Sequence, residues 1–364
     1  MEQAGEVRSA RVESLRAIAA LGVLVGHVFG ITHWRQGPEN DLERVVASGQ
    51  FSVYLFFVLS GYLLFWPFAR RAFGDGRRID LRRYAVNRAL RILPLYYATV
   101  VVYLLVRADG GTLDQWLLFL TFSENFSTDT VLTVNPVMWS LVIELHFYAL
   151  LPLLALALAR LAKGSLGRAA IAIAALGAAS FLLRWPTLYD DPTPDPHLRY
   201  SLPSCFMFFA AGMLLAPLRL RWERSRPRGL VAAPEAWIAA AIGLWIFVAL
   251  GTNRGYLTAP AAFLLIGACV LPLRPSRVVA ALDWRPLALV GIASYSLYLW
   301  HVLVVHELAE RVELPTFPAL FAVAGPLCLA AAGVSYALVE RPLLKLRRRW
   351  GERPLSHASA SKTL

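Results

Sequence analysis

The first apolar segment of the chain reads Arg16-Ala-Ile-Ala-Ala-Leu-Gly-Val-Leu-Val-Gly-His27. Eleven residues of α-helix complete roughly three turns, so Arg16 and His27 are predicted to lie on one helix face. At ~1.5 Å per residue they are about 16 Å apart along the axis. In a membrane about 30 Å thick, Arg16 then lies at one surface and His27 near the middle. An ionisable group at that depth is costly, which indicates a functional site.

Apolar segments recur along the whole chain. Hydrophobic residues make up 57% of the 364 residues, whereas soluble domains contain about 45–50%. We therefore predict an all-α, polytopic membrane protein with about ten transmembrane helices. Their approximate ranges are 14–33, 51–69, 90–107, 137–160, 168–184, 203–218, 235–251, 256–273, 287–306 and 317–340. Residues 113–122 are apolar but too short to span, and predict an interfacial or re-entrant element.

The net charge of +12 is explained by where the basic residues fall. With a cytoplasmic N-terminus, 29 of the 36 Lys and Arg residues lie on cytoplasmic segments. This positive-inside pattern predicts that both termini are cytoplasmic and that the protein is a multi-pass protein of the plasma membrane. No nucleic-acid partner is needed to explain the charge. Only three of the basic residues are lysine, which indicates a GC-rich bacterial genome.

The sequence predicts one membrane domain over residues 1–350 and a disordered cytoplasmic tail over residues 351–364. Three cysteines fall inside predicted spans, with no spacing typical of a disulfide framework or a metal site: Cys205, Cys269 and Cys328. We therefore expect no bound metal and no resident cofactor.

His27 is the first candidate for chemistry. A neutral histidine can act as a general base toward a hydroxyl group, and its ordinary pKa near 6.5 suits that role. The alternative is structural: Arg16 extends to the membrane surface and His27 forms a hydrogen bond between helices. Spacing alone does not separate the two interpretations.

A second candidate group lies in the run Trp139-Ser140-Leu-Val-Ile-Glu144-Leu-His146-Phe-Tyr148. Ser140, Glu144 and Tyr148 are four residues apart and share a helix face. We expect Glu144 to lie at the depth of His27, where a carboxylate could pair with the imidazole and support its charged form. The alternative is a buried acid that pairs elsewhere, for example with His146.

Two further groups are weaker by themselves. Arg88 and Arg91 share a face at the cytoplasmic mouth of the third span, and arginine forks suit phosphates. The two arginines also fit the ordinary excess of basic residues on cytoplasmic segments. Ser294, Tyr298 and His301 share a face in Ser294-Tyr-Ser-Leu-Tyr298-Leu-Trp-His301, where tyrosine and histidine are also common membrane-interface anchors.

Taken in order, these segments resemble the acyltransferase-3 family of integral-membrane acyltransferases. The resemblance covers nearly the whole chain. It includes Arg16 with His27, the run Phe56-Phe-Val-Leu-Ser-Gly-Tyr-Leu63, Arg88 with Arg91 and Pro94, Trp139 to Glu144, and the run that ends at His301. Glu13-Ser14 stands where the family often has Asp-Gly, so the acid is retained but lengthened. The chain resembles the stand-alone form, without an esterase-like domain after the spans.

The resemblance implies an acyl group, most often acetyl, moved from cytoplasmic acyl-CoA to a hydroxyl. The acceptor would be a glycan, a glycolipid or a glycosylated metabolite. His27 would be the catalytic base or a transient acyl carrier, with Glu144 in support. Arg16, Arg88 and Arg91 would bind the donor, while Trp139, Ser140, Tyr148, Ser294, Tyr298 and His301 would bind the acceptor or support the site.

Two other classes of function remain open from the residues. In a proton-coupled transporter or flippase for a polar solute, His27 and Glu144 would form a proton relay. A membrane glycosyltransferase would use acidic residues of the first outer loop, which is short here and contains Glu39, Asp41 and Glu43. Release of CoA would distinguish the acyltransferase from both.

Overall fold

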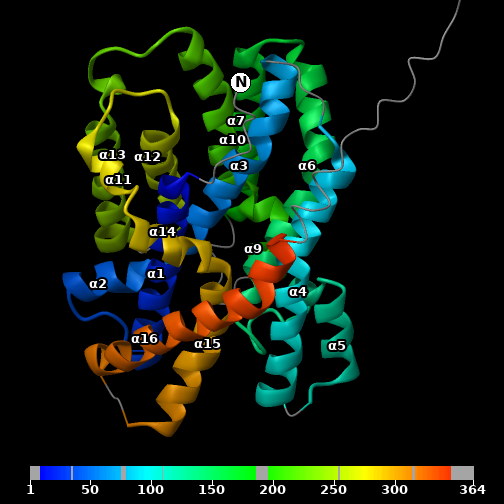
Figure 1. Cartoon of the computed structure of the whole chain (residues 1–364), viewed down its shortest axis with the longest axis vertical. Coiled ribbons are helices and arrows are strands. Elements are labelled where there is room, and N and C mark those ends of the chain that lie inside the picture. Colours follow the sequence, from blue (N-terminus) through cyan, green and yellow to red (C-terminus); the bar gives the residue numbers. More distant parts are fainter. Residues whose placement is uncertain are drawn as a thin grey trace, which may run out of the picture.

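The computed structural model describes residues 9–33, 36–74, 79–108, 110–185, 196–252, 255–313 and 316–345 (Figure 1). All regular secondary structure in these ranges is helical. The long helices are α1 (Ala10–Thr32), α3 (Val53–Phe73), α4 (Leu81–Arg107), α6 (Met138–Ala162), α7 (Leu166–Arg184), α10 (Leu202–Arg224), α11 (Pro234–Phe247), α12 (Thr258–Val270), α15 (Ser294–Arg311) and α16 (Phe317–Ser335). The tail predicted for residues 351–364 lies outside the described residues.

Eight helical segments within the described ranges are long and apolar enough to cross a membrane. A ninth forms if α14 (Arg285–Ile292) and α15 are one span, bent by 70° between them. The tenth predicted segment is represented by α12, which is apolar but only 13 residues long. The all-α, polytopic architecture is therefore confirmed. Of the ten predicted spans, residues 287–306 correspond to the bent pair α14 and α15, and residues 256–273 to the short helix α12.

Shorter helices connect these segments. They are α2 (Asp41–Ala47), η1 (Ser48–Ser52), α5 (Leu113–Leu120), η2 (Glu124–Phe126), α9 (Pro196–Arg199), η3 (Gly229–Ala232), η4 (Val248–Thr252), η5 (Gly255–Leu257), α13 (Arg277–Ala281) and η6 (Tyr336–Glu340). The eight-residue α5 matches the apolar segment predicted over 113–122 and is too short to span. Its N-terminus is closed by a capping box between Thr112 and Gln115.

Contacts across the bundle fix the relative direction of the helices around α1. Arg16 lies beside Ser294 and His27 beside His301, so α1 and α15 run in the same direction. Tyr295 contacts Ile92 near the middle of α4, and Arg107 at the end of α4 contacts Glu307. Helix α4 is therefore parallel to both. In Figure 1, α15 and α16 lie together, while α3, α7 and α10 lie side by side in the other half of the molecule.

Helix α1 packs against η1 with almost no space between the backbones. A Cβ atom added at Gly26 would lie 2.1 Å from the amide nitrogen of Gln50, and one at Gly49 would lie 2.5 Å from the carbonyl oxygen of Gly22. Gly22 and Gly26 are four residues apart, the spacing of small residues that lets membrane helices approach closely. This packing fixes the position of α1, the helix that bears His27.

Aromatic rings fill the contact between α3, α6 and α10. Phe209 stacks on Phe57 with ring centroids 4.8 Å apart and on Phe147 at 4.1 Å, while Tyr54 stacks on Phe208 at 3.9 Å. The guanidinium of Arg184, only 1% exposed, donates to the Tyr54 hydroxyl and to the carbonyl of Arg199. Stacking and these hydrogen bonds join α7 to the same core.

Candidate active site

His27 meets a second histidine across the α1–α15 contact. The Nε2 atom of His301 lies 3.4 Å from Nδ1 of His27, and the two rings are edge to face with centroids 5.0 Å apart. Nδ1 of His27 also lies 2.9 Å from the carbonyl oxygen of Val23, and Nδ1 of His301 lies 2.7 Å from that of Tyr298.

These contacts assign the protons of both rings. A carbonyl oxygen only accepts hydrogen bonds, so each Nδ1 atom carries a proton. Nε2 of His301 is then an acceptor, and it lies 3.4 Å from the Nδ1 atom of His27, whose hydrogen has its nearer acceptor in the Val23 carbonyl at 2.9 Å. Nε2 of His27 then carries a lone pair with no hydrogen-bond partner among the residues that the structure describes, which is the state that a general base requires.

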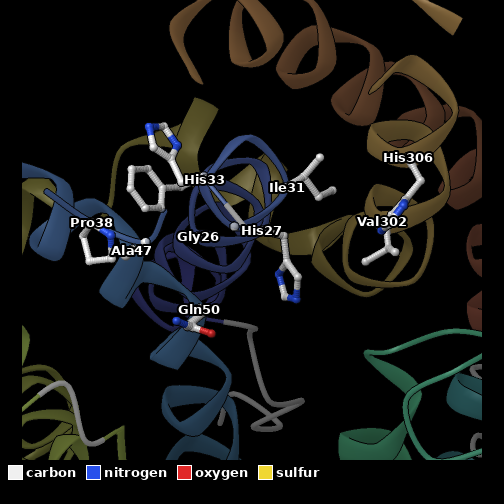
Figure 2. A pocket seen from close by; sticks show the side chains of 12 residues that line it. Gly26, His27, Ile31, His33, Pro38, Ala47, Gln50, Val302 and His306 are labelled. Carbon is white, nitrogen blue, oxygen red and sulfur yellow. The ribbon is translucent and has the colours of Figure 1, made fainter. Parts of the chain in front are cut away.

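The His27 ring projects into a cavity of about 250 Å³ (Figure 2). The figure shows His27, Ile31 and His33 extending from the α1 end, with Val302 and His306 on α15. Gln50 of η1 and Pro38 also line the cavity. The cavity lies at the Thr32 end of α1, the outer end in the orientation predicted from charge.

Glu144 does not pair with His27, which overturns that part of the sequence-based hypothesis. Its carboxylate instead accepts hydrogen bonds from Ser60 on α3 and from Tyr148 one turn along α6. His146 is not its partner either, since that ring stacks near Phe126. The shared face predicted for Glu144 and Tyr148 is confirmed, but this face contacts α3 rather than α1.

Two of the three predicted donor-binding arginines lie near other predicted site residues. The Arg88 guanidinium lies over the Tyr148 ring at 5.7 Å, and its buried Nε atom has no hydrogen-bond acceptor among the described residues. Nε of Arg16 donates to Ser294 at 3.2 Å and lies 3.5 Å from the Glu13 carboxylate. The acid at position 13 thus remains close to Arg16 despite its longer side chain.

The remaining predicted residues form the wall between α6 and α15. The hydroxyls of Ser140 and Tyr298 lie 2.7 Å apart, and Tyr298 is also 3.1 Å from the carbonyl of Val137. Trp139 packs edge-on against Phe57. The fold therefore brings each member of the Ser294–His301 face to a partner on another helix, as the shared face predicts.

Sequence reasoning missed Glu340 as a candidate. Glu340, Arg341 and Pro342 close the last span and read as an ordinary helix stop, yet Glu340 is only 7% exposed and accepts a hydrogen bond from Ser296 at 2.6 Å. It ends a π-helical turn, a feature common at functional sites. An acid in the last turn of an apolar span was the available signal.

Glu124, in the loop between α5 and α6, was missed as well. It is completely buried, and the Tyr96 hydroxyl lies 2.8 Å from its Oε1 and 2.9 Å from the carbonyl of Phe119. A tyrosine has one proton to donate, so both contacts are satisfied when Glu124 is itself protonated. Burial raises the pKa of Glu124 to about 8, in agreement with this arrangement.

Comparison with known proteins gives several relatives. ExoZ, named an exopolysaccharide production protein, from Rhizobium meliloti (strain 1021), is 28% identical over 318 residues, 82% of this chain and 91% of ExoZ. Nodulation protein 10 of Rhizobium leguminosarum bv. viciae is 26% identical, over 94% of this chain and 95% of that protein. The O-acetyltransferase OatA of Staphylococcus aureus (strain NCTC 8325 / PS 47) is 24% identical over 92% of this chain.

Coverage differs among the relatives. The chain spans 57% of OatA and 54% of YrhL of Bacillus subtilis (strain 168), which is 28% identical over 91% of this chain. No solved structure matches the chain. Residues 9–339 match the family described as an acyltransferase domain, which is nearly all of the helical bundle. The chain therefore belongs to the acyltransferase-3 family.

Proposed function

We propose that this protein transfers an acyl group, acetyl in the simplest case, from acyl-CoA to a hydroxyl of a glycan, glycolipid or glycosylated metabolite. The observation that carries the proposal is the free Nε2 lone pair of His27 in a cavity of the bundle. Family membership and the O-acetyltransferase name of OatA support the same chemistry. We propose that the protein lies in a bacterial plasma membrane, with the orientation that the charge pattern predicts.

Arg88, Arg91 and Arg16 are proposed to bind the donor. CoA is polyanionic, and a guanidinium binds phosphate through charge-assisted hydrogen bonds. The buried Nε–H of Arg88 still has a hydrogen bond to give, which a phosphate oxygen could accept. From there the pantetheine arm would carry the thioester toward His27, about 16 Å from the level of Arg16 at ~1.5 Å per residue.

The transfer step follows from the state of His27. Nε2 accepts the proton of the acceptor hydroxyl as its oxygen bonds to the thioester carbonyl carbon. The C–S bond breaks, the sulfur takes the proton from Nε2, and the products are an ester and CoA–SH. During the step His27 is an imidazolium, and its Nδ1–H is stabilised by the Val23 carbonyl at 2.9 Å and by the Nε2 lone pair of His301 at 3.4 Å.

An acyl-histidine intermediate is the other route that the same geometry permits. In it Nε2 itself bonds to the thioester carbonyl carbon, the C–S bond breaks, and CoA leaves as its thiolate, which leaves an acyl-imidazolium. The acceptor hydroxyl oxygen then bonds to the acyl carbon, the bond to Nε2 breaks, and the hydroxyl proton passes to Nε2. The two routes differ in one observable. Only the second lets CoA leave, and the enzyme become acylated, before the acceptor arrives.

The acceptor is proposed to approach from the outer end of α1. The cavity at His27 includes His33 and Gln50, whose polar groups can bind hydroxyls. The name of ExoZ refers to exopolysaccharide production, which is consistent with a glycan acceptor here.

The test is thiol release from acetyl-CoA by protein in sealed proteoliposomes, with wild type beside His27→Ala. We expect release that rises when bacterial glycan extract is supplied, label transfer to the extract, and loss of both in the variant. His306→Ala is the control, because His306 lines the opposite wall of the same cavity. This variant should lose acceptor contacts but still hydrolyse the donor, whereas His27→Ala should lose both activities. No CoA binding and no release across a panel of acyl-CoA donors would contradict the proposal and favour a transporter.

A further inference from the structure

A second cavity adjoins the one at His27. It has a volume of about 170 Å³ and is bordered by Arg107 at the end of α4, by Thr133 in the loop before α6, and by α15. Val302 and His306 of α15 line both cavities (Figure 2). These two residues are four apart and share a helix face, so the two cavities meet along one face of α15.

Each cavity alone is small for a ligand site. Ligand pockets typically measure about 300–1,000 Å³, and the two cavities reach that range only when they are taken together. A ligand whose reacting hydroxyl lies at His27 can extend past His306 into the second cavity. The arrangement therefore favours an acceptor with at least two linked rings.

The lining of the second cavity combines hydrogen-bonding groups with apolar surface. A guanidinium has five N–H donors, and Arg107 gives three of them to Glu307 and Glu310. Its other two N–H groups have no acceptor among the residues that the structure describes. Thr133 adds a hydroxyl, and Leu132, which is 41% exposed, adds apolar surface. A sugar ring, with hydroxyls around its edge and C–H groups on its faces, fits such a lining.

The charges beside the second cavity balance. Arg107 is paired with Glu310 at 2.7 Å and with Glu307 at 3.3 Å, and Arg311 is paired with Glu307 at 2.8 Å. These two cations and two anions leave no net positive charge that would attract a carboxylate or phosphate of the ligand. An anionic ligand would also compete with Glu310 for Arg107. The balance therefore favours an uncharged sugar.

We propose that the second cavity binds an uncharged sugar unit that is linked to the unit being acylated, so that the acceptor is a glycan of at least two sugar units. The acylated unit occupies the cavity at His27, and His306 lies where the two units join. The second unit accepts hydrogen bonds from Arg107. This inference rests on the proposed function, because it places the reacting hydroxyl at His27.

Fragments of bacterial glycan extract test the required length of the acceptor. The extract is partially hydrolysed and separated into fractions of one, two and three sugar units, and each is supplied at the same molar concentration with labelled acetyl-CoA to wild-type protein in nanodiscs. We expect label transfer to be about 10-fold faster with two units than with one, as two further hydrogen bonds would give. A third unit should change the rate by less than 2-fold. Mass spectrometry of the labelled two-unit product should show an uncharged sugar next to the acetylated one.

Thr133→Trp is the decisive variant because it fills the second cavity from an exposed loop position. The ratio of the two-unit rate to the one-unit rate should fall to about 1, whereas general structural damage would slow both rates alike. Thr128→Trp is the matched control: it makes the same exchange at an exposed residue of the same loop that lines neither cavity. Its ratio should stay within 2-fold of wild type.

Arg107→Lys keeps the positive charge and removes the guanidinium fork. It should lower the same ratio about 3- to 10-fold, because a single ammonium group cannot replace both free N–H donors while it pairs with Glu310.

The outcomes separate this inference from the proposed function. Equal rates with one and two units in wild type overturn the second sugar site and leave the transferase standing. An unchanged ratio in Thr133→Trp, a charged sugar next to the acetylated one, or label found only in unhydrolysed extract would overturn it as well. If acetyl-CoA is not cleaved and the unhydrolysed extract takes no label, the proposed function itself fails.

Discussion

Nε2 of His301 lies 3.4 Å from Nδ1 of His27, 274 residues earlier in the chain, and shares the Nδ1–H of His27 with the nearer Val23 carbonyl at 2.9 Å. This pair replaces the carboxylate–histidine pair that the sequence suggests. A neutral acceptor stabilises an imidazolium less than a carboxylate does, but it leaves the resting His27 uncharged and ready to take a proton.

His301→Ala should lower kcat by about 100-fold, with little change in KM for either substrate, because it removes an interaction that strengthens only when His27 is charged. His301→Gln offers a side-chain oxygen as acceptor and should recover part of the rate. Steady-state kinetics of both variants measures this. A rise of KM at constant kcat would mean instead that His301 contacts the acceptor.

Arg88→Ala combined with Arg91→Ala should raise the KM for acyl-CoA more than the KM for the acceptor. A hydrogen bond to a charged group contributes about 1.5–3 kcal/mol, or ~10- to 100-fold in binding for each arginine that contacts phosphate. Arg82→Ala with Arg83→Ala, on the exposed first turn of the same helix, is the control. Equal effects on both substrates would indicate a structural role.

Glu144→Gln should affect donor binding and leave the pH dependence of kcat unchanged. Glu144 contacts Tyr148, whose ring faces Arg88, and it does not contact His27. Gln can accept from Ser60 and Tyr148, so the fold should be retained and only the charge lost. A pH–rate profile is the measurement, and a shifted basic limb in kcat would restore the link to His27 that the geometry removes.

Stability should depend on pH through Glu124. Its pKa is raised to about 8 in the folded protein, against about 4.3 for an unperturbed Glu. The folded state therefore holds the extra proton, and stability is greatest below pH ~4 and declines as pH rises to about 8. Glu124→Gln, which stays neutral and can donate to Tyr96, should raise Tm at pH 8 by about 4 °C or more and flatten the decline. Thermal unfolding in detergent at pH 5 and pH 8 tests both, and an unchanged slope would show that Glu124 is ionised in the fold.

Gly26→Ala should destabilise the protein strongly, because its Cβ would lie 2.1 Å from the Gln50 nitrogen, a backbone atom that cannot move aside cheaply. Gly333→Ala is the control, since no atom lies within 4 Å of a Cβ there. In a helix, that exchange should be neutral or stabilising by up to about 1 kcal/mol. Comparison of Tm for the two variants decides it, and equal Tm values would mean that α1 can move away from η1.

Much of the fold could be predicted from sequence because apolar length and helical periodicity are local properties. The ten apolar segments, the short α5 and the face shared by Ser294, Tyr298 and His301 all follow from spacing. Which helix packs against which does not, because it depends on side-chain fit across distant segments. Depth alone places His27 and Glu144 at one level, but it cannot give their azimuth around the bundle.

The two buried acids, Glu340 and Glu124, also could not be predicted from the local sequence. Glu340 directly follows the apolar run Tyr336-Ala-Leu-Val339 and looks like a polar helix end. Ser296, on a distant helix, donates a hydrogen bond to it. Glu124 lies in a loop with no distinctive sequence pattern, and it is buried where Tyr96 of α4 contacts its carboxyl group. No local sequence pattern predicts the surroundings of either acid.

The backbone contact between α1 and η1 has a consequence for how such enzymes could change substrate. Close packing of Gly22 and Gly26 on α1 against Gly49 on η1 restricts movement of α1, so the proposed base, His27, has a fixed position in the bundle. Acyl groups or sugars of different size must then be accommodated by the opposite wall, on α15 and the loop after α1. Divergence among relatives with different substrates should accordingly be concentrated on that wall, while the glycine side stays constant.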